Sequence, residues 1–168
     1  HILTDAPQLL KEDPDIVDKI PSHYKVRTRP QSALRDLQRL LSLTDNQPIL
    51  FELFSFDFPK TSDLAGKASM LLVYHRTKLN LTNIMPILHN LGIHVIDQLT
   101  SRFGDSNTTI GYILAFRLVD HELNKLNESQ VEKRLNDVLS AVFLGQLPND
   151  AINQLVLSSV LTVSDIFI

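Results

Sequence analysis

The histidines are the first residues to consider for metal binding or proton transfer. The sequence holds six of them and no cysteine. His89 and His94 are separated by Gly92, which should end a helix between them. His75 and His121 have no second ligand at a spacing typical of metal sites. No Ser-His-Asp order with a nucleophile elbow occurs either. We therefore expect no metal site and no catalytic residue in this chain.

The glycines decide whether a nucleotide could bind in the usual way. A dinucleotide site needs a glycine-rich turn between a strand and a helix, because backbone amides must approach the pyrophosphate closely. The chain has five glycines, and each stands alone, without a G-x-G pair or a G-x-x-x-x-G-K run. We expect no cofactor in this segment.

Size and composition indicate one globular domain, or one domain with part of a neighbour. Of the 168 residues, 43% are apolar and 21% are charged, and the formal net charge is −3. This weak, scattered charge argues against nucleic acid or an anionic membrane as a partner. The apolar runs are too short to span a bilayer, and the absence of cysteine fits a reducing compartment. We therefore expect a cytoplasmic protein.

The two ends of the chain suggest a fragment. The chain begins at His1 instead of methionine, and it finishes on the apolar run 166–168 just after a helix start at Thr162. An apolar end of this kind needs a following segment to cover it. We expect a longer parent protein that continues beyond this point.

The first 46 residues predict helices. A short one follows Asp13, with Pro14 at its first position, where proline is tolerated. A longer one follows Pro30 and runs to about Leu43, because its leucines repeat at helical spacing. The polar residues assigned to its solvent face are Arg35, Asp36, Gln38 and Arg39. We also interpret the cations of this region as a solvated surface, since no aromatic residues alternate with them. These cations are Lys25, Arg27, Arg29, Arg35 and Arg39.

Beyond Pro48 the pattern becomes one of strands, rich in residues that favour β-structure. The predicted strands cover residues 49–58 and 68–75, begin again at 94–99, and continue at 108–118. The first two can pair antiparallel, and the last two form a hairpin around a Gly-Asp-Ser-Asn turn.

A helix is predicted between the second and third strands, and its ends carry recognisable residues. Thr82 is a good N-cap, and Pro86 is tolerated if it lies in the first turn. Gly92 ends the helix in the left-handed conformation, with Ile93 making the apolar contact that accompanies such a cap.

The last predicted elements are also helical. Ser129–Glu132 matches the capping-box pattern at the start of a helix that Gly145 ends. Another helix should begin at Pro148–Asp150 and carry Ile152.

From residue 68 to residue 143 the order is strand, helix, strand, strand, helix. This is a split βαβ, or ferredoxin-like, α+β sandwich whose last strand is missing or displaced, and the early strand at Ile49–Phe54 can occupy the vacant edge. We divide the chain into a helical lead-in (1–46), an α+β core (47–128) and a C-terminal helical segment that packs on the core (129–168).

Three stretches resemble, in the same order, the ACT region of the large NAD-specific glutamate dehydrogenases. Met70–His75 with Leu81–Asp97 resembles a strand, the helix pattern L-S-x-x-L-P-x-L-x-N-L-G-x-x-V-x-D and a second strand. Ile20–Tyr24 resembles that family's F-P-x-x-Y segment. Asp137–Leu157 resembles F-x-x-x-W-x-G-x-x-x-x-D-x-x-N-x-L-V-L, with Phe143 where tryptophan is usual. The resemblance makes the core an ACT-like domain, a ferredoxin-like module that often binds amino acids at domain interfaces.

The resemblance implies a non-catalytic regulatory or assembly segment of an NAD-dependent glutamate dehydrogenase. The parent would oxidise L-glutamate to 2-oxoglutarate, with NAD bound in another part of the enzyme. The expected partners are other domains or subunits of that enzyme and a small amino acid.

If an effector binds, the resemblance places it at the turn after the strand that ends at His75, where helix amides suit a carboxylate. The residues singled out are Thr77, Asn80 and Thr82, and Asn80 stands near the glycine that is usual in ligand-binding ACT modules. The plain alternative is that Thr82 only caps the helix. A further alternative on the same fold is an acylphosphatase-like hydrolase that uses Arg76 and Asn80.

Overall fold

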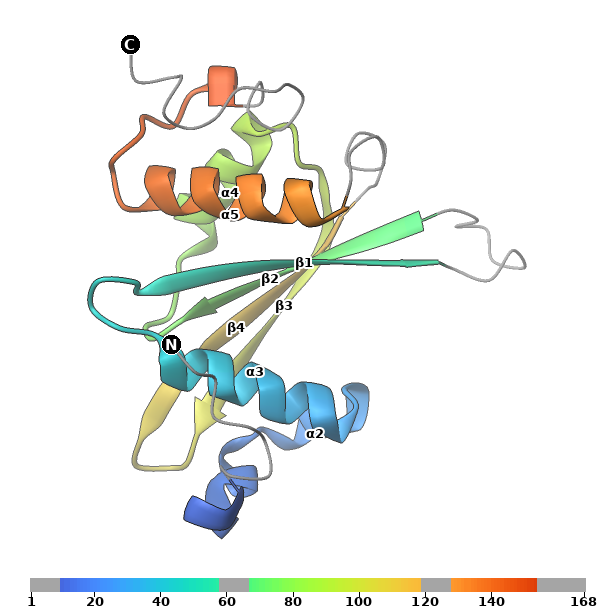
Figure 1. Ribbon diagram of the computed structural model, residues 1–168, viewed down its shortest axis with the longest axis vertical. Coiled ribbons are helices and arrows are strands. Elements are labelled where there is room, and N and C mark those ends of the chain that lie inside the picture. The colour runs from blue at the N-terminus through green and yellow to red at the C-terminus, as the bar shows by residue number, and fades with distance from the viewer. Residues whose placement is uncertain (1–9, 58–66, 119–127, 154–168) are drawn as a thin grey trace. The chain divides into compact units, whose positions relative to one another are not determined.

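The computed structural model describes residues 10–57, 67–118 and 128–153. Figure 1 shows the elements in these ranges. The helices are η1 (Pro14–Lys19, a 3₁₀ helix), α2 (Ser22–Arg27), α3 (Pro30–Ser42), α4 (Leu81–Asn90), α5 (Glu128–Phe143) and η3 (Ala151–Asn153, a 3₁₀ helix). The strands are β1 (Ile49–Asp57), β2 (Lys67–His75), β3 (Val95–Gly104) and β4 (Thr109–Leu118).

The described strands form one antiparallel sheet in the order β1-β2-β4-β3. The β3–β4 hairpin contributes two neighbouring strands, and β2 lies between β4 and β1. The order confirms the predicted ferredoxin-like, ACT-like α+β fold. It also confirms that the early strand, β1, occupies the edge that the fourth strand has in a ferredoxin-like sheet.

The chain divides into two compact units, each built from stretches that are distant in sequence. The first contains the described residues 10–50, 74–78 and 100–114. The second contains the described residues 51–57, 67–73, 79–99, 115–118 and 128–153. The three-part division expected from the sequence stays a prediction.

In the first unit, α3 packs through one stripe of its surface. Ala33, Leu37 and Leu40 are buried, and their spacing of four and three residues places them on one helical face. Asp36 lies on the same face and is 1% exposed. The assignment of Asp36 to the solvent face is therefore wrong. Its spacing from Ala33 and Leu40 determines its position, and hydrogen bonds compensate its burial.

In the second unit, α4 and α5 lie side by side (Figure 1). Their buried side chains are Ile84, Ile87 and Leu88 on α4 and Leu135, Val138, Leu139 and Val142 on α5. α5 also reaches β1, because Asn136 Oδ1 accepts a hydrogen bond from the amide of Phe51 at 3.3 Å. A helix side chain thus satisfies one amide of an edge strand.

Two helix ends follow the prediction. Gly92 has φ of +74°, and its amide donates to the carbonyl of His89 at 2.9 Å. Ile93 is buried, and its amide donates to the carbonyl of Leu88, also at 2.9 Å. These two bonds form a Schellman cap. Gly145, with φ of +70°, ends α5 in the same conformation.

The start of α4 differs from the prediction. The helix begins at Leu81, and its N-cap is Asn80 and not Thr82. Both residue types are good caps, so the sequence alone did not decide between them. Pro86 lies inside the helix, in its second turn and not in the first. The carbonyl of Thr82 therefore lacks its usual helical donor, since proline has no N–H.

Three other predictions change or fall outside the described residues. α5 begins at Glu128, so Ser129 is its second residue and does not precede the helix as predicted. α2 was not predicted, because six residues are too few to show a helical period. Of the helix expected after Pro148, the structure describes η3, and the remainder, including the start at Thr162, lies outside the described residues.

Candidate functional site

Thr77, the first predicted effector residue, lies just after β2 in the first unit. The imidazole of His75 folds onto it, with Nδ1 lying 3.1 Å from the amide nitrogen and 3.0 Å from the hydroxyl oxygen of Thr77. Nδ1 also lies 2.8 Å from the Thr77 carbonyl oxygen. With its proton on Nε2 the ring accepts from the amide, and with a proton on Nδ1 it donates to the carbonyl. The histidine thus shapes this turn in either tautomer.

Asn80 and Thr82, the other two predicted residues, lie at the start of α4 in the second unit. Asn80 Oδ1 accepts a hydrogen bond from the amide of Thr82 at 3.2 Å. The carbonyl of Asn80 accepts from the amide of Asn83 at 3.0 Å. Asn80 has φ of −83°, so it does not adopt the positive φ that a glycine in this turn could use. An oxygen ligand at these amides would have to replace the Asn80 side chain.

Arg76, considered for phosphate binding, is engaged with the end of α3. Its guanidinium donates to the carbonyl of Leu43 and to the carboxylate of Asp45, the latter at 3.1 Å. Both bonds come from the forked end of the side chain, which suits two acceptors at once. Together with the capping role of Asn80, this accounts for both residues of the acylphosphatase alternative as parts of the fold.

Sequence reasoning missed a buried carboxylate with two tyrosine partners. Asp36 Oδ2 accepts from the hydroxyl of Tyr24 at 2.7 Å, and Oδ1 accepts from the hydroxyl of Tyr74 at 2.9 Å. Arg35 adds an ion pair at 3.3 Å. Tyr24 and Tyr74 are buried as well, so each donor and acceptor replaces a bond to water. The signal available in the sequence was the spacing of Asp36 from Ala33 and Leu40.

The surroundings of Tyr24 change its acidity. Burial raises the pKa of the Tyr24 phenol well above its ordinary range, and the neighbouring carboxylate of Asp36 raises the pKa further. Both effects disfavour the phenolate, because a buried charge next to another negative charge is costly. Tyr24 is therefore a hydrogen-bond donor here and not a proton-transfer group.

α2 is held to β3 by two side chains. His23 Nε2 lies 3.0 Å from the hydroxyl oxygen of Ser101, and the ring of Tyr24 meets that of Phe103 edge to face at 4.9 Å between centroids. A histidine beside a serine can activate a nucleophile, yet Ser101 is only 2% exposed, which keeps its hydroxyl from a substrate. The pair serves packing of the short helix.

The described part of the chain holds neither a cluster of metal ligands nor a helix fit to cross a membrane. There, no group of three or more His, Cys, Asp or Glu side chains is placed to hold a metal ion. None of the helices in the described ranges combines the length and apolar character that a bilayer crossing requires.

The chain is similar to known proteins of one kind. Residues 55–131 match the sequence model of the family described as glutamate dehydrogenase, ACT3 domain. An NAD-specific glutamate dehydrogenase of Pseudomonas aeruginosa is 30% identical over 153 residues, which cover 90% of this chain and 9% of that protein. One of Halomonas elongata is 23% identical over 143 residues, covering 84% of this chain and 8% of that protein. The chain thus spans less than a tenth of either relative.

Proposed function

We propose that this chain, with its ACT-like region, is a non-catalytic regulatory or assembly segment of an NAD-dependent glutamate dehydrogenase. The observation that carries this proposal is the similarity to such an enzyme over 90% of the chain. The match to the ACT3 domain at residues 55–131 supports the regulatory role.

The reaction belongs to the whole enzyme. The parent converts L-glutamate, NAD and water to 2-oxoglutarate, ammonium and NADH, and it binds NAD in another part of its chain. The glycines of this segment stand alone, whereas a pyrophosphate site needs several together. This supports an NAD site in another part of the enzyme. The partners of the segment are then other domains or subunits of a cytoplasmic enzyme.

A chimeric enzyme tests the proposal. The stretch aligned with this chain in the Pseudomonas aeruginosa relative is replaced by the present chain, and the mass of the assembly and the rate of NADH formation from glutamate are measured. We expect the chimera to assemble and to turn over, whereas replacement by an unrelated α+β domain of equal length disturbs assembly or regulation. Equal behaviour of the two replacements would contradict the proposal.

An amino-acid sensor is the second candidate, and the geometry of Asn80 favours considering it. The Asn80 side chain already places an oxygen on the amide of Thr82, which is the position that an effector carboxylate would take at a helix N-terminus. Binding would exchange the asparagine oxygen for the carboxylate. Thr77 would then be the nearest hydroxyl that precedes the helix in sequence.

Thermal unfolding of the chain with glutamate and a panel of other amino acids at millimolar concentration tests the sensor. A shift selective for one amino acid, and lost on substitution of Asn80 or Thr82, would support it, because a ligand stabilises the state it binds. If no amino acid shifts the unfolding temperature, the sensor role is contradicted and only the assembly role stands. Asn83→Ala serves as the control, since Asn83 lies in the same turn.

A further inference from the structure

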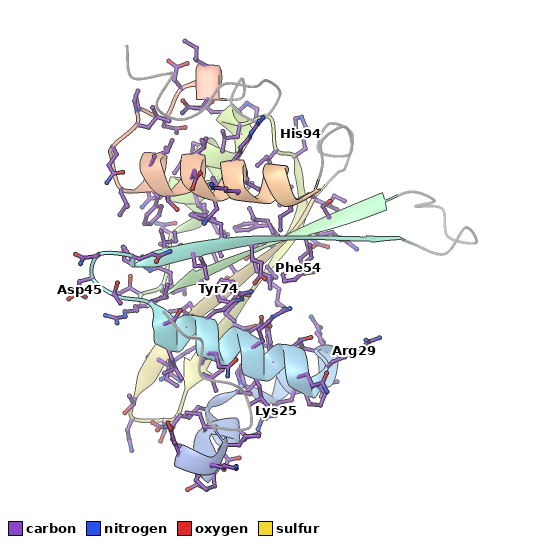
Figure 2. The ribbon with its side chains drawn as sticks, viewed as in Figure 1. Lys25, Arg29, Asp45, Phe54, Tyr74 and His94 are labelled. Atoms are coloured by element: carbon purple, nitrogen blue, oxygen red, sulfur yellow. The ribbon has the colours of Figure 1, made fainter. Side chains whose placement is uncertain are left out.

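In the first unit, side chains at the end of β2 form hydrogen bonds at two points, one on α3 and one on the residues that follow α3. The buried hydroxyl of Tyr74 donates to Asp36 at 2.9 Å. Two residues later, Arg76 donates to the carbonyl of Leu43 and to the carboxylate of Asp45. Figure 2 labels Tyr74 and Asp45 at these two points. The strand end is therefore fixed to the middle of α3 and to its C-terminal end.

A close backbone approach lies between these two points. A Cβ atom added to Gly111 on β4 would come within 2.8 Å of the carbonyl oxygen of His75 and within 2.9 Å of Cδ2 of Leu40. Both distances are too short for a carbon atom. The absence of a side chain at Gly111 therefore lets both Leu40 of α3 and the backbone of His75 lie close to β4 at this residue.

The two hydrogen-bonded contacts involve α3 and its C-cap. Asp36 and Leu40 are four residues apart and lie on one helical face, and Leu43 is the C-cap residue that follows the helix. Asp36 accepts from Tyr74, and the carbonyl of Leu43 accepts from Arg76, which Thr77 follows in the chain. A displacement of this short segment must therefore be accommodated by α3, because close-packed contacts do not stretch.

We propose that α3 is the positioning element of the turn after β2, with Asp36 and Arg76 as the positioning residues. A change of state at Thr77 then alters the stability of α3, and a partner bound to α3 alters the turn by the same free energy. This inference rests on the proposed regulatory function, because it names the residues that would couple the turn after β2 to α3. It also enlarges the regulatory unit, since α3 lies outside the matched residues 55–131.

Amide hydrogen exchange of the full 168-residue chain, resolved by NMR, tests the inference. Asp36→Asn keeps the side-chain volume and removes the charge, and Arg76→Gln removes an exposed guanidinium. We expect Arg76→Gln to speed exchange in the C-terminal half of α3 roughly fivefold, the factor for losing one hydrogen bond. We expect Asp36→Asn to speed exchange of the Thr77 amide, which a purely local role in the core would leave unchanged.

Matched controls make the result specific. Arg102→Gln removes another exposed arginine of the first unit, one that bonds to Thr109 and to the carbonyl of Asp105, and it should leave both α3 and Thr77 unchanged. Unchanged exchange of the Thr77 amide in Asp36→Asn, or of α3 in Arg76→Gln, would overturn the inference. If Asp36→Asn does not fold, Arg76→Gln at its exposed position decides alone.

The result of the exchange experiment does not depend on whether the proposed function is correct. Exchange is measured without glutamate, NAD or the rest of the enzyme, so an error in assigning the parent enzyme does not alter it. Conversely, a negative exchange result leaves the behaviour of the chimeric enzyme unaffected. The two ideas can therefore fail separately.

Discussion

Tyr24 donates its hydroxyl to the carboxylate of Asp36 across 2.7 Å, and this bond joins α2 to α3. Both residues are buried, so the bond lies where water cannot replace it. Asp36 takes a second hydroxyl from Tyr74, which ties the same carboxylate to β2. One charged residue thus connects two helices and a strand in the first unit.

Removing the Tyr24 hydroxyl should destabilise the chain measurably. Tyr24→Phe keeps the ring contact with Phe103 and deletes one hydrogen bond to a charged group, so we expect a loss of about 2 kcal/mol in the free energy of unfolding. Urea unfolding followed by circular dichroism measures this loss. Tyr112→Phe on β4 is the control, with an expected change below about 0.5 kcal/mol. Equal losses in both variants would show that the hydrogen bond from Tyr24 to Asp36 adds no more to the free energy of unfolding than the Tyr112 hydroxyl does.

Tyr24 also predicts how stability depends on alkaline pH. Its pKa is raised in the folded chain above the ordinary value of 10.0, because burial and Asp36 disfavour the phenolate. The unfolded chain therefore loses the Tyr24 proton first, and its contribution is complete below pH 10.0 and declines above it. The difference in unfolding free energy between the natural chain and Tyr24→Phe should stay constant from neutral pH to about pH 9 and shrink beyond pH 10. A constant difference up to pH 11 would contradict the assignment.

Asp105 gives the opposite dependence at acid pH. Its Oδ1 accepts from the amides of Asn107 and Thr108 at 2.8 and 2.7 Å, and these bonds lower the pKa of the carboxyl. A lowered pKa in the folded state stabilises the chain above the unfolded pKa, and the effect disappears as pH falls through the folded pKa. Asp105→Ala should therefore lower stability at pH 7, and the difference from the natural chain should shrink as the pH falls below the ordinary carboxyl pKa of 3.8. A difference that persists at the lowest pH would exclude this mechanism.

The cap of α4 offers a direct comparison of two neighbours. Asn80→Ala removes the side chain that accepts from the Thr82 amide, and we expect it to cost about 1 kcal/mol. Thr82→Ala should cost less than about 0.5 kcal/mol, because Thr82 lies inside the helix. Thermal unfolding of the two variants measures the order. A larger loss for Thr82→Ala would show that Thr82, the residue predicted from the sequence, is the N-cap after all.

Much of the fold could be predicted because it depends on local patterns. Alternating and helical periods located the strands and the longer helices, and Gly92 and Gly145 marked two helix ends through the positive φ that glycine tolerates. Even the displaced edge strand followed from counting elements against the split βαβ order. These features involve residues that are near one another in the chain.

The features that could not be predicted depend on contacts between residues far apart in the chain, or on a choice between two residues that are equally good caps. Asp36 and Tyr74 are 38 residues apart, and no local pattern links them. Residue type placed Asp36 in solvent, although its spacing pointed inward, and the two tyrosines that compensate its burial become visible only in three dimensions. Asn80 and Thr82 are both good caps, so the difference between them depended on where the turn after β2 ends.

Deleting this segment from its parent enzyme tests whether it has the proposed regulatory or assembly role in a glutamate dehydrogenase. The segment is removed with folding of the remainder checked by circular dichroism, and the assembly mass and NADH formation are followed over a range of glutamate concentrations. We expect an altered assembly mass or an altered dependence of the rate on glutamate, with NAD still bound. An enzyme that assembles and oxidises glutamate as before would contradict the proposed role.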